Sequence, residues 1–313
     1  MRTLHSSVRF ICVVTLAILS GCAGATPKDG FAPGLTANSN HSGQKAPIAP
    51  SSYLGARDLY VADLHSNSIK ILKNKSYAEL GQITNGIDGP QSVSLDRHGN
   101  LYVANLDGGN VTEYAPNGTT PLFTYSDQLS EPTRVAADAH DNVFVADQSD
   151  DKILQYFQQS NTLAAACSQS GFILGIAVDS SNDVFVSTSS GQLIEYPGGL
   201  AGCNATVLGV SIPGAAFGMT VDKQNDLVVC NTSGGTIDVI APPYSSVTRT
   251  FGSSLAEPVN VTLNRDNKLA FVVDWEKDVQ VYNFATGALV QTLGTPYGLT
   301  NPFSAVDGPN AVY

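Results

Sequence analysis

A short pattern of residues recurs about every 42 positions through most of this chain. Its clearest copy, residues 89–117, reads GPQSVSLDRHGNLYVANLDGGNVTEYAPN and holds three short apolar stretches separated by turn-forming residues. The polar residue that closes the first stretch recurs at intervals of 42, 41, 43, 42 and 43, as Asp96, Asp138, Asp179, Asp222, Asn264 and Asp307. A repeat of this length, made of strands with no room for a helix, predicts the blades of a β-propeller.

Two further sets of positions keep the same period. The second stretch of each copy closes with Asp63, Asn105, Asp147, Ser187, Asn231 and Asp274, and the third closes with Leu72, Tyr114, Tyr156, Tyr196, Ile240 and Tyr282. The second stretches read LYVA, VFVA, VFVS, LVVC and AFVV, so they are apolar at successive positions instead of alternating. Such strands are buried on both faces, as they are when blades pack against each other around a ring.

The first and last copies are each incomplete. Residues 58–73 have the second and third stretches without a clear first one, whereas residues 301–307 have a first stretch and little after it. We therefore expect the C-terminal segment to supply the inner strand of the blade begun by residues 58–73, which removes an exposed sheet edge. The sequence predicts an all-β domain over residues 53–313, a six-bladed β-propeller of four-stranded antiparallel blades closed by the C-terminal strand.

The repeat also carries a family resemblance. The pattern P-x-x-V-x-x-D-x-x-x-N-L-Y-V-A-D/N, followed by a V/I-x-x-Y strand, resembles the NHL-repeat propellers over roughly residues 58–313. The resemblance implies the propeller fold. It implies little about activity, because such propellers include binding proteins, hydrolases and lyases.

The N-terminus has the features of an export signal. Residues 1–21 combine two arginines with the apolar run FICVVTLAIL, which indicates a secretory signal peptide. The segment LSGC ending at Cys22 matches the bacterial lipobox, so the chain resembles a lipoprotein lipidated on Cys22; the alternative is an ordinary cleaved signal followed by a chance cysteine. Residues 22–52 are rich in Gly, Ala, Pro, Ser and Asn without apolar periodicity, which predicts a disordered tether.

The expected cellular location and the net charge restrict the possible binding partners. We expect the propeller to lie outside the cytoplasm in the bacterial cell envelope, anchored in the outer membrane rather than the inner one, because Ala23 is not the Asp that retains enteric lipoproteins in the inner membrane. Without residues 1–21, which hold two arginines and no acid, 14 basic residues face 27 acidic ones, a formal charge of −13. Such a surface repels nucleic acid. The expected partners are the membrane, through the anchor, and an unknown protein or small-molecule ligand.

The five cysteines differ in their expected roles. Cys12 leaves with the signal peptide, and Cys22 is the anchor. Cys230 takes the place that alanine holds in other copies, so we expect a buried, inert thiol. Cys167 and Cys203 fall in the outer parts of neighbouring blades, where an exported protein can form a disulfide. Whether their side chains meet is left open at this point.

The starts of the inner strands are the expected lining of a central pocket, because they share one face of the ring with the loops between second and third strands. These starts read Gln91-Ser92, Thr133-Arg134, Leu174-Gly175, Gly218-Met219, Val259-Asn260 and Phe303-Ser304. Arg134 can hold a carboxylate or phosphate as a bidentate fork, or pair with an acid of a neighbouring blade. Asn260 and Gln91 offer amides at the channel mouth. Trp275, in a rim loop, can stack on a ligand or be structural.

The recurring acids are expected to be structural. A short carboxylate at an equivalent position in every copy accepts backbone hydrogen bonds in turns, whereas a catalytic residue should break the symmetry of the repeat.

Motifs for catalysis are weak. Gluconolactonase-like propellers, related by fold, hold a divalent cation with E-G-P and P-D-G segments; here the comparable segments are Glu131-Pro132-Thr133 and Glu257-Pro258-Val259, and no P-D-G occurs. Streptogramin lyases of similar fold use histidines near the pocket, but His98 and His140 fall in turns on the opposite face, and His65 lies alone in a rim loop. We therefore expect no metal and no other cofactor.

The leading hypothesis is a lipid-anchored, non-catalytic propeller that binds a ligand or a protein. The alternative is a metal-dependent lactonase or other hydrolase that uses Arg134, Asn260 and Glu257. A streptogramin-type lyase is a third hypothesis, which requires a histidine beside the pocket.

Overall fold

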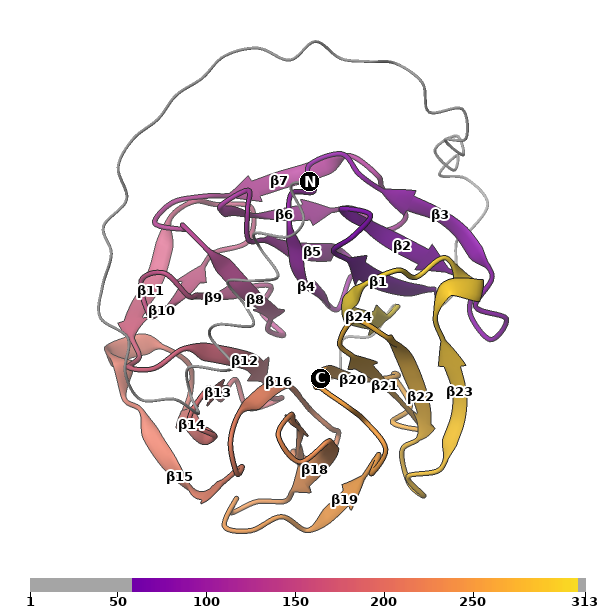
Figure 1. Ribbon diagram of the computed structural model, residues 1–313. Helices are drawn as coiled ribbons and strands as arrows, with labels where there is room; N and C mark the ends of the chain where they lie inside the picture. Colours follow the sequence, from indigo (N-terminus) through magenta and orange to yellow (C-terminus); the bar gives the residue numbers. More distant parts are fainter. Residues whose placement is uncertain (1–57, 309–313) are drawn as a thin grey trace, which may run out of the picture.

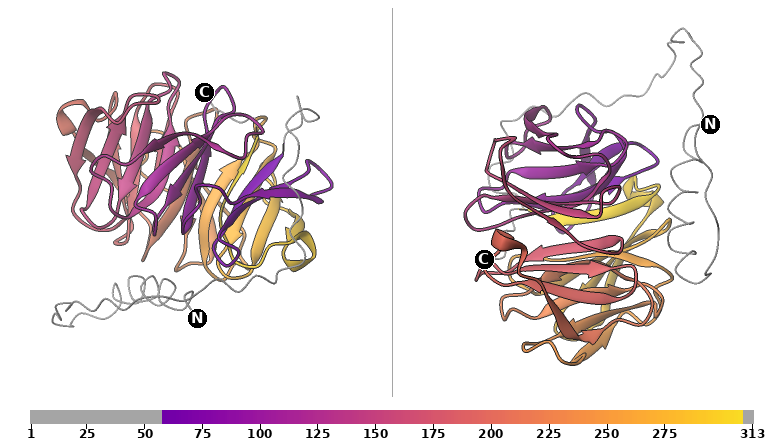
Figure 2. Two further views of the ribbon diagram at one scale, coloured as in Figure 1. Left: turned by 90° about the horizontal axis from the view of Figure 1, so that it is seen from above. Right: turned by 90° about the vertical axis from the view of Figure 1, so that its left-hand side faces the viewer.

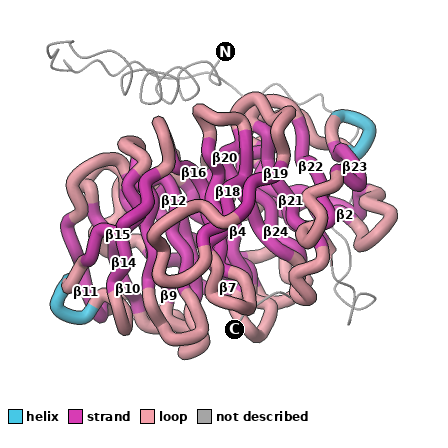
Figure 3. Tube along the Cα trace, turned by 90° about the horizontal axis from the view of Figure 1, so that it is seen from below, coloured by secondary structure: helices cyan, strands magenta, loops and turns pink. Residues whose placement is uncertain are grey.

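The computed structural model describes residues 58–308; the segments predicted to be a signal peptide and a tether, and the predicted lipidation site Cys22, lie outside the described residues. Six sheets of four antiparallel strands are arranged around a central axis, and Figure 1 looks along that axis. In the edge-on views of Figures 2 and 3 the strands run across the thickness of a disc. The predicted all-β, six-bladed propeller is confirmed.

Each blade has an inner strand, two middle strands and an outer strand. The inner strands are β24 (Pro302–Asp307), β4 (Pro90–Leu95), β8 (Pro132–Ala137), β12 (Ile173–Val178), β16 (Ala216–Val221) and β20 (Pro258–Leu263). The second strands are β1 (Leu59–Asp63), β5 (Leu101–Asn105), β9 (Val143–Asp147), β13 (Val184–Thr188), β17 (Leu227–Asn231) and β21 (Leu269–Asp274). The third strands are β2 (Ser68–Leu72), β6 (Asn110–Tyr114), β10 (Lys152–Tyr156), β14 (Gln192–Tyr196), β18 (Thr236–Ile240) and β22 (Asp278–Asn283).

The outer strands leave one edge of each blade at the circumference. They are β3 (Glu79–Ile83), β7 (Pro121–Tyr125), β11 (Leu163–Ser168), β15 (Thr206–Ser211), β19 (Arg249–Phe251) and β23 (Leu289–Leu293). In the described part of the chain, two short 3₁₀ helices, η2 (Ala201–Cys203) and η3 (Thr295–Tyr297), interrupt the connections. Within residues 58–308 no helix has the length and apolar character needed to cross a membrane.

The ring closes as the sequence predicts. β24 pairs with β1, and Val306 lies opposite Tyr60. The carboxylate of Asp63 fixes the chain just before β24, because it accepts hydrogen bonds from the backbone N–H of Thr300 at 2.6 Å and of Asn301 at 3.1 Å. Burial alone would raise the pKa of Asp63, but these backbone hydrogen bonds hold it below its usual value. The closing contact is therefore charged at neutral pH.

Two members of the repeat alignment are wrong by one residue. Asp307 pairs with Leu59, so it is the last residue of its strand, and the turn position falls to Gly308, whose N–H donates to the Asp58 carbonyl at 2.8 Å. Likewise Thr188, and not Ser187, pairs with the first residue of its inner strand. In both places a polar residue lies next to the position that is equivalent in the structure, and residue type alone does not show which of the two neighbours belongs to the repeat.

The recurring acids do hold the turns, as predicted. In the turn after β4, Oδ1 of Asp96 accepts the N–H of His98 at 2.9 Å and of Asn100 at 2.8 Å. Asp138, Asp179 and Asp222 accept the two equivalent N–H groups in their own turns. These carboxylates are committed to the backbone.

The core lies between blades, because both faces of every second strand are apolar. Five clusters of buried residues fill the spaces between neighbouring sheets. Tyrosines that close third strands bury their rings there and donate a hydrogen bond from the hydroxyl. Tyr114 donates to the backbone carbonyl of Asn85 at 2.7 Å, and Tyr196 to Oε1 of Gln169 at 2.9 Å. Burial on this scale, at roughly 25 cal/mol per Å² of apolar surface, dominates the stability of the ring.

Candidate functional site: the central channel

A β-bulge near the start of every inner strand closes one end of the channel. The pairing register shifts there in all six blades. The bulged residues are each 2% exposed or less: Gln91, Thr133, Leu174, Phe217, Val259 and Phe303. The bulge turns these side chains into the protein, so this end of the channel is packed.

The residue after each bulge contacts the next blade. Oγ of Ser304 accepts the N–H of Val93 at 3.1 Å, and Oγ of Ser92 accepts the N–H of Val135 at 3.4 Å. Oδ1 of Asn260 accepts the N–H of Ala305 at 3.1 Å. Three blades are thus joined to their neighbours by a side chain that satisfies a backbone donor at the axis. The equivalent positions in the other three blades hold Arg134, Gly175 and Gly218.

The two glycines let neighbouring strands approach more closely. A Cβ on Gly218 would lie 2.6 Å from the carbonyl oxygen of Val259, and a Cβ on Gly175 would lie 2.7 Å from that of Phe217. Oγ of Ser187 donates to the same Phe217 carbonyl at 2.8 Å. Glycine is needed at both positions for lack of space.

Arg134 is the largest side chain of this layer and lies within the channel wall. Its Nε donates to the carbonyl of Leu174 at 2.7 Å, and its Nη1 donates to the carbonyl of Thr133 at 2.7 Å. The guanidinium carbon lies 5.1 Å from the ring centroid of Phe217 and 5.3 Å from that of Phe303, which is cation–π geometry. Arg134 therefore links its own blade to three others.

The charge of Arg134 has no carboxylate partner among the described residues. Its Nη2 is buried and has no hydrogen-bond acceptor among residues 58–308. Burial lowers the pKa of Arg134 to about 10, which leaves it charged at neutral pH. The interpretation of Arg134 as half of an ion pair between blades is therefore not what the structure shows.

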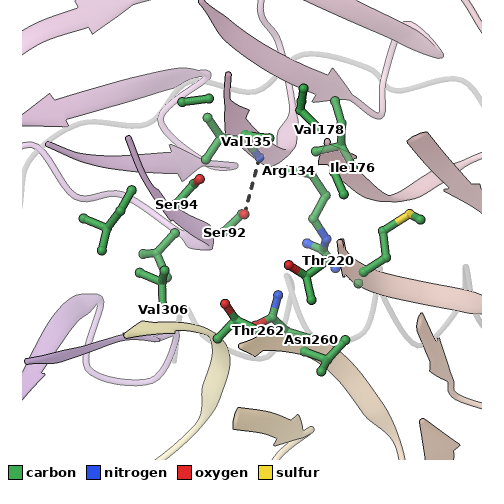
Figure 4. Close-up of a pocket in the computed structure, with 18 of the residues that line it drawn as sticks. Ser92, Ser94, Arg134, Val135, Ile176, Val178, Thr220, Asn260, Thr262 and Val306 are labelled. Atoms are coloured by element: carbon green, nitrogen blue, oxygen red, sulfur yellow. Dashed lines mark hydrogen bonds between the residues drawn. The ribbon is translucent and has the colours of Figure 1, made fainter. Parts of the chain in front are cut away.

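A cavity of about 110 Å³ continues along the axis from Arg134 (Figure 4). The inner-strand starts expected from the sequence line it in part, through Ser92, Arg134, Gly218, Met219 and Asn260. The later residues of the inner strands line it as well, whereas the bulged residues do not. One layer of it consists of small side chains: Ser94, Ala136, Ala177, Thr220, Thr262 and Val306. Ser94, Thr220 and Thr262 are half-buried, whereas the bulged residues are fully buried. The cavity therefore reaches solvent at the end where the inner strands finish.

The four predicted binding residues are only partly brought together. Arg134 and Asn260 both line the cavity. Gln91 is buried behind it, and its Oε1 has no partner among residues 58–308. Trp275 is 8% exposed and packs edge-on against Phe303, with 6.3 Å between ring centroids, so it supports the closed end.

The sequence analysis did not identify the residues that contact Arg134 or those that supply hydroxyl groups to the cavity. Phe217 and Phe303 hold the guanidinium, and Ser94, Thr220 and Thr262 supply hydroxyl groups. The hydroxyl residues were detectable, because all three stand two positions before the residue that closes the inner-strand repeat. The phenylalanines were not, since nothing in the sequence marks a bulge.

The residues considered for a metal site or a lyase do not meet at the cavity. Residues 58–308 contain no group of three or more His, Cys, Asp or Glu suited to hold a metal ion. Burial, and then the nearby Glu276 and Asp274, raise the pKa of Glu257. No histidine lines the cavity. Nε2 of His98 lies 3.3 Å from Oδ2 of Asp141, in the turns after β4 and β8.

The remaining cysteines are structural. Cys167 in β11 and Cys203 at the end of η2 form a disulfide between neighbouring blades, with an S–S distance of 2.11 Å. Cys230 is buried with a free thiol, and burial raises its pKa well above the usual value.

No protein-family model matches the chain, and no curated protein matches it in sequence. Solved structures match its fold. A chain of a nidogen–laminin complex has 15% identity and a TM-score of 0.68, over 80% of this chain and 97% of that one. A Bacteroides caccae protein of unknown function has 12% identity and a TM-score of 0.67, over 82% and 100%. A streptogramin B lyase has 12% identity and a TM-score of 0.55, over 67% and 70%. At these identities the likeness shows the fold alone.

Proposed function

We propose that this protein is a non-catalytic binding or scaffold propeller of the NHL-repeat type, held by a lipid on Cys22 at the outer membrane and facing away from the cytoplasm. The observation that carries the non-catalytic part is the use of its polar side chains. Asp96 and its equivalents hold turns, Ser92, Asn260 and Ser304 join blades, and Arg134 packs between aromatic rings. A catalytic site needs such groups free to meet a substrate.

Metal binding distinguishes this proposal from the lactonase alternative. A thermal-shift titration with calcium, zinc and manganese is expected to give no saturable shift, because Asn260 and Glu257 do not converge with other carboxylates on the cavity. A saturable shift at micromolar metal that disappears in Asn260→Ala would favour the enzyme instead. Hydrolysis of a panel of lactones, lost in the same variant, would have the same meaning.

The anchor is tested separately. Replacing the lipobox cysteine, Cys22→Ser, should move the protein from the membrane fraction to the soluble extracytoplasmic fraction and abolish labelling with a fatty acid. The propeller should stay folded, because all six sheets are built from strands within residues 58–308. A Cys22→Ser protein that remains in the membrane fraction would refute the lipid anchor and leave the binding role unaffected.

A further inference from the structure

The closed end of the channel holds a cation that the fold does not neutralise. Arg134 is 3% exposed, and two of its nitrogens are satisfied by neutral carbonyl oxygens. Among residues 58–308 no carboxylate lies within ion-pair distance of it. A buried charge without a counter-charge is costly, so this position favours a bound anion.

The cavity next to Arg134 offers further donors. The hydroxyls of Ser94, Thr220 and Thr262 make no hydrogen bond to other residues within 58–308, and all three residues line the cavity with Arg134. In Figure 4 the side chain of Arg134 extends toward Thr220 of β16, and Thr262 lies on the neighbouring inner strand β20. A guanidinium with nearby hydroxyls is a donor set for an oxyanion or a halide.

The size of the cavity restricts the ligand. Its volume of about 110 Å³ is well below the roughly 300–1,000 Å³ of pockets for drug-sized ligands. The wall is also partly apolar, from Ala136, Ile176, Val178 and Val306. A halide or a carboxylate of one or two carbons fits such a space, whereas a sugar or a nucleotide does not.

The open end of the channel carries charges of both signs. The turns after the inner strands surround the open end of the channel. Their exposed charged residues include four basic ones and one acid: Arg97, Lys223, Arg265, Lys268 and Asp266. The laddered carboxylates in these turns are buried and bonded to backbone N–H groups. Arg97 is paired with Asp141 at 2.9 Å, and the same turns also hold buried or half-buried aspartates, so the rim as a whole is not basic. The attraction for an anion therefore comes from Arg134 itself.

We propose that the central channel is a binding site for one small anion, a halide or a short carboxylate such as formate or acetate, held between Nη2 of Arg134 and the hydroxyls of Ser94, Thr220 and Thr262. The site is independent of the partner that the propeller binds. It gives the otherwise unpaired guanidinium a counter-charge at the point where the blades meet.

Calorimetric titration with sodium bromide and sodium formate tests this proposal. The full-length protein, in a buffer whose only other anion is too large for the cavity, should bind one equivalent with a Kd below about 1 mM. Arg134→Met should weaken binding at least tenfold. The matched control is Arg249→Met, which removes an arginine that also lies over two phenylalanine rings, at the outer edge of the ring, and should leave the Kd unchanged. No saturable binding by the wild-type protein, or equal binding by Arg134→Met, would overturn the proposal.

Two further measurements apply if Arg134→Met does not fold. Thr220→Val, which keeps the shape of the side chain and removes its hydroxyl, should weaken bromide binding several-fold. An unchanged Kd would show that the hydroxyl groups do not bind the anion and would contradict the proposed site. Crystals grown in bromide should show an anomalous peak within hydrogen-bond distance of Nη2 of Arg134. A water molecule bridging Nη2 and Oε1 of Gln91 in its place would refute the anion site.

Discussion

Two arginines of this protein make nearly the same contacts in different places. Arg134 at the axis lies over Phe217 and Phe303, and Arg249 in the outer strand β19 lies over Phe251 at 5.4 Å and Phe284 at 4.7 Å. Each also donates to a backbone carbonyl, Arg249 through Nη1 to Phe284 at 2.6 Å. The difference is solvent: Arg134 is buried, whereas Arg249 is half-buried.

The comparison shows that radial position sets the cost of a charge in a propeller. At the circumference water screens Arg249, and its charge acts on the nearby Asp226. At the axis all blades converge, and Arg134 is surrounded by carbonyls and aromatic rings, with no carboxylate of residues 58–308 at ion-pair distance. The same side chain is therefore a surface clamp in one place and a buried, unpaired charge in the other. Four experiments sharpen or break this comparison.

Truncation of the two arginines should give the largest difference. Arg134→Ala should lower the free energy of unfolding by about 2–4 kcal/mol, because it leaves two buried carbonyl oxygens without a donor and opens a cavity. Arg249→Ala should cost about 1 kcal/mol or less, since water replaces its contacts. Urea unfolding followed by tryptophan fluorescence measures both. Equal losses would mean that position relative to the axis does not matter.

Added methyl groups probe the packing at the same two radii. Gly218→Ala should destabilise by about 1–3 kcal/mol, because its Cβ meets the Val259 carbonyl. At the circumference a Cβ on Gly209 meets Ser245 at 3.8 Å, an ordinary contact, so Gly209→Ala should change the stability by no more than about 0.5 kcal/mol. Thermal unfolding of the two variants measures both changes in stability. A tolerated alanine at position 218 would argue that the inner strands can move apart.

The aromatic contacts can be compared by double-mutant cycles. Arg134→Met with Phe217→Leu should show a coupling energy of about 1–2 kcal/mol, and Arg249→Met with Phe284→Leu about 0.5–1 kcal/mol. The larger value is expected where water is excluded. A smaller coupling at the axis than at the circumference would reverse the inference drawn from burial.

The smallest expected effect is a change in the pKa of Asp226. Burial and then Asp222 raise the pKa of Asp226, and Arg249 partly offsets the rise. Its protonated form therefore adds stability that is present at low pH and is lost as the pH rises through the folded pKa. Arg249→Met should raise this pKa further and move the loss to higher pH, while Arg134→Met should leave it unchanged. An NMR titration of the carboxyl carbon follows both. A pKa unaffected by Arg249→Met would show that water screens the pair completely.

The fold was almost fully predictable from the sequence, for a physical reason. Each blade repeats the same local chemistry, so errors at one position are corrected by the others. The alignment failed only at Ser187 and Asp307, where a polar neighbour imitated the true position. The closing pair of β1 and β24 followed from two incomplete copies.

The channel was less predictable, because its properties come from departures from the repeat. The sequence identified Arg134 as unusual but not what it contacts. Its neighbours Phe217 and Phe303 come from distant blades, and bulges turn them inward. The sequence also included the bulged residues in the cavity lining and missed the later residues of the inner strands, since burial by a bulge leaves no mark on composition. Trp275 illustrates the same limit: a loop residue in the sequence, it is covered by the fold.

The junction of β1 and β24 has a consequence for biosynthesis. Asp63 and Thr300, which meet at this junction, are 237 residues apart in the chain. A chain growing from the ribosome therefore presents the edge of its earliest blade unprotected until synthesis is nearly finished, and that edge is open to pairing with other nascent chains. A stop codon before β24 would leave the first blade without its inner strand and the ring open.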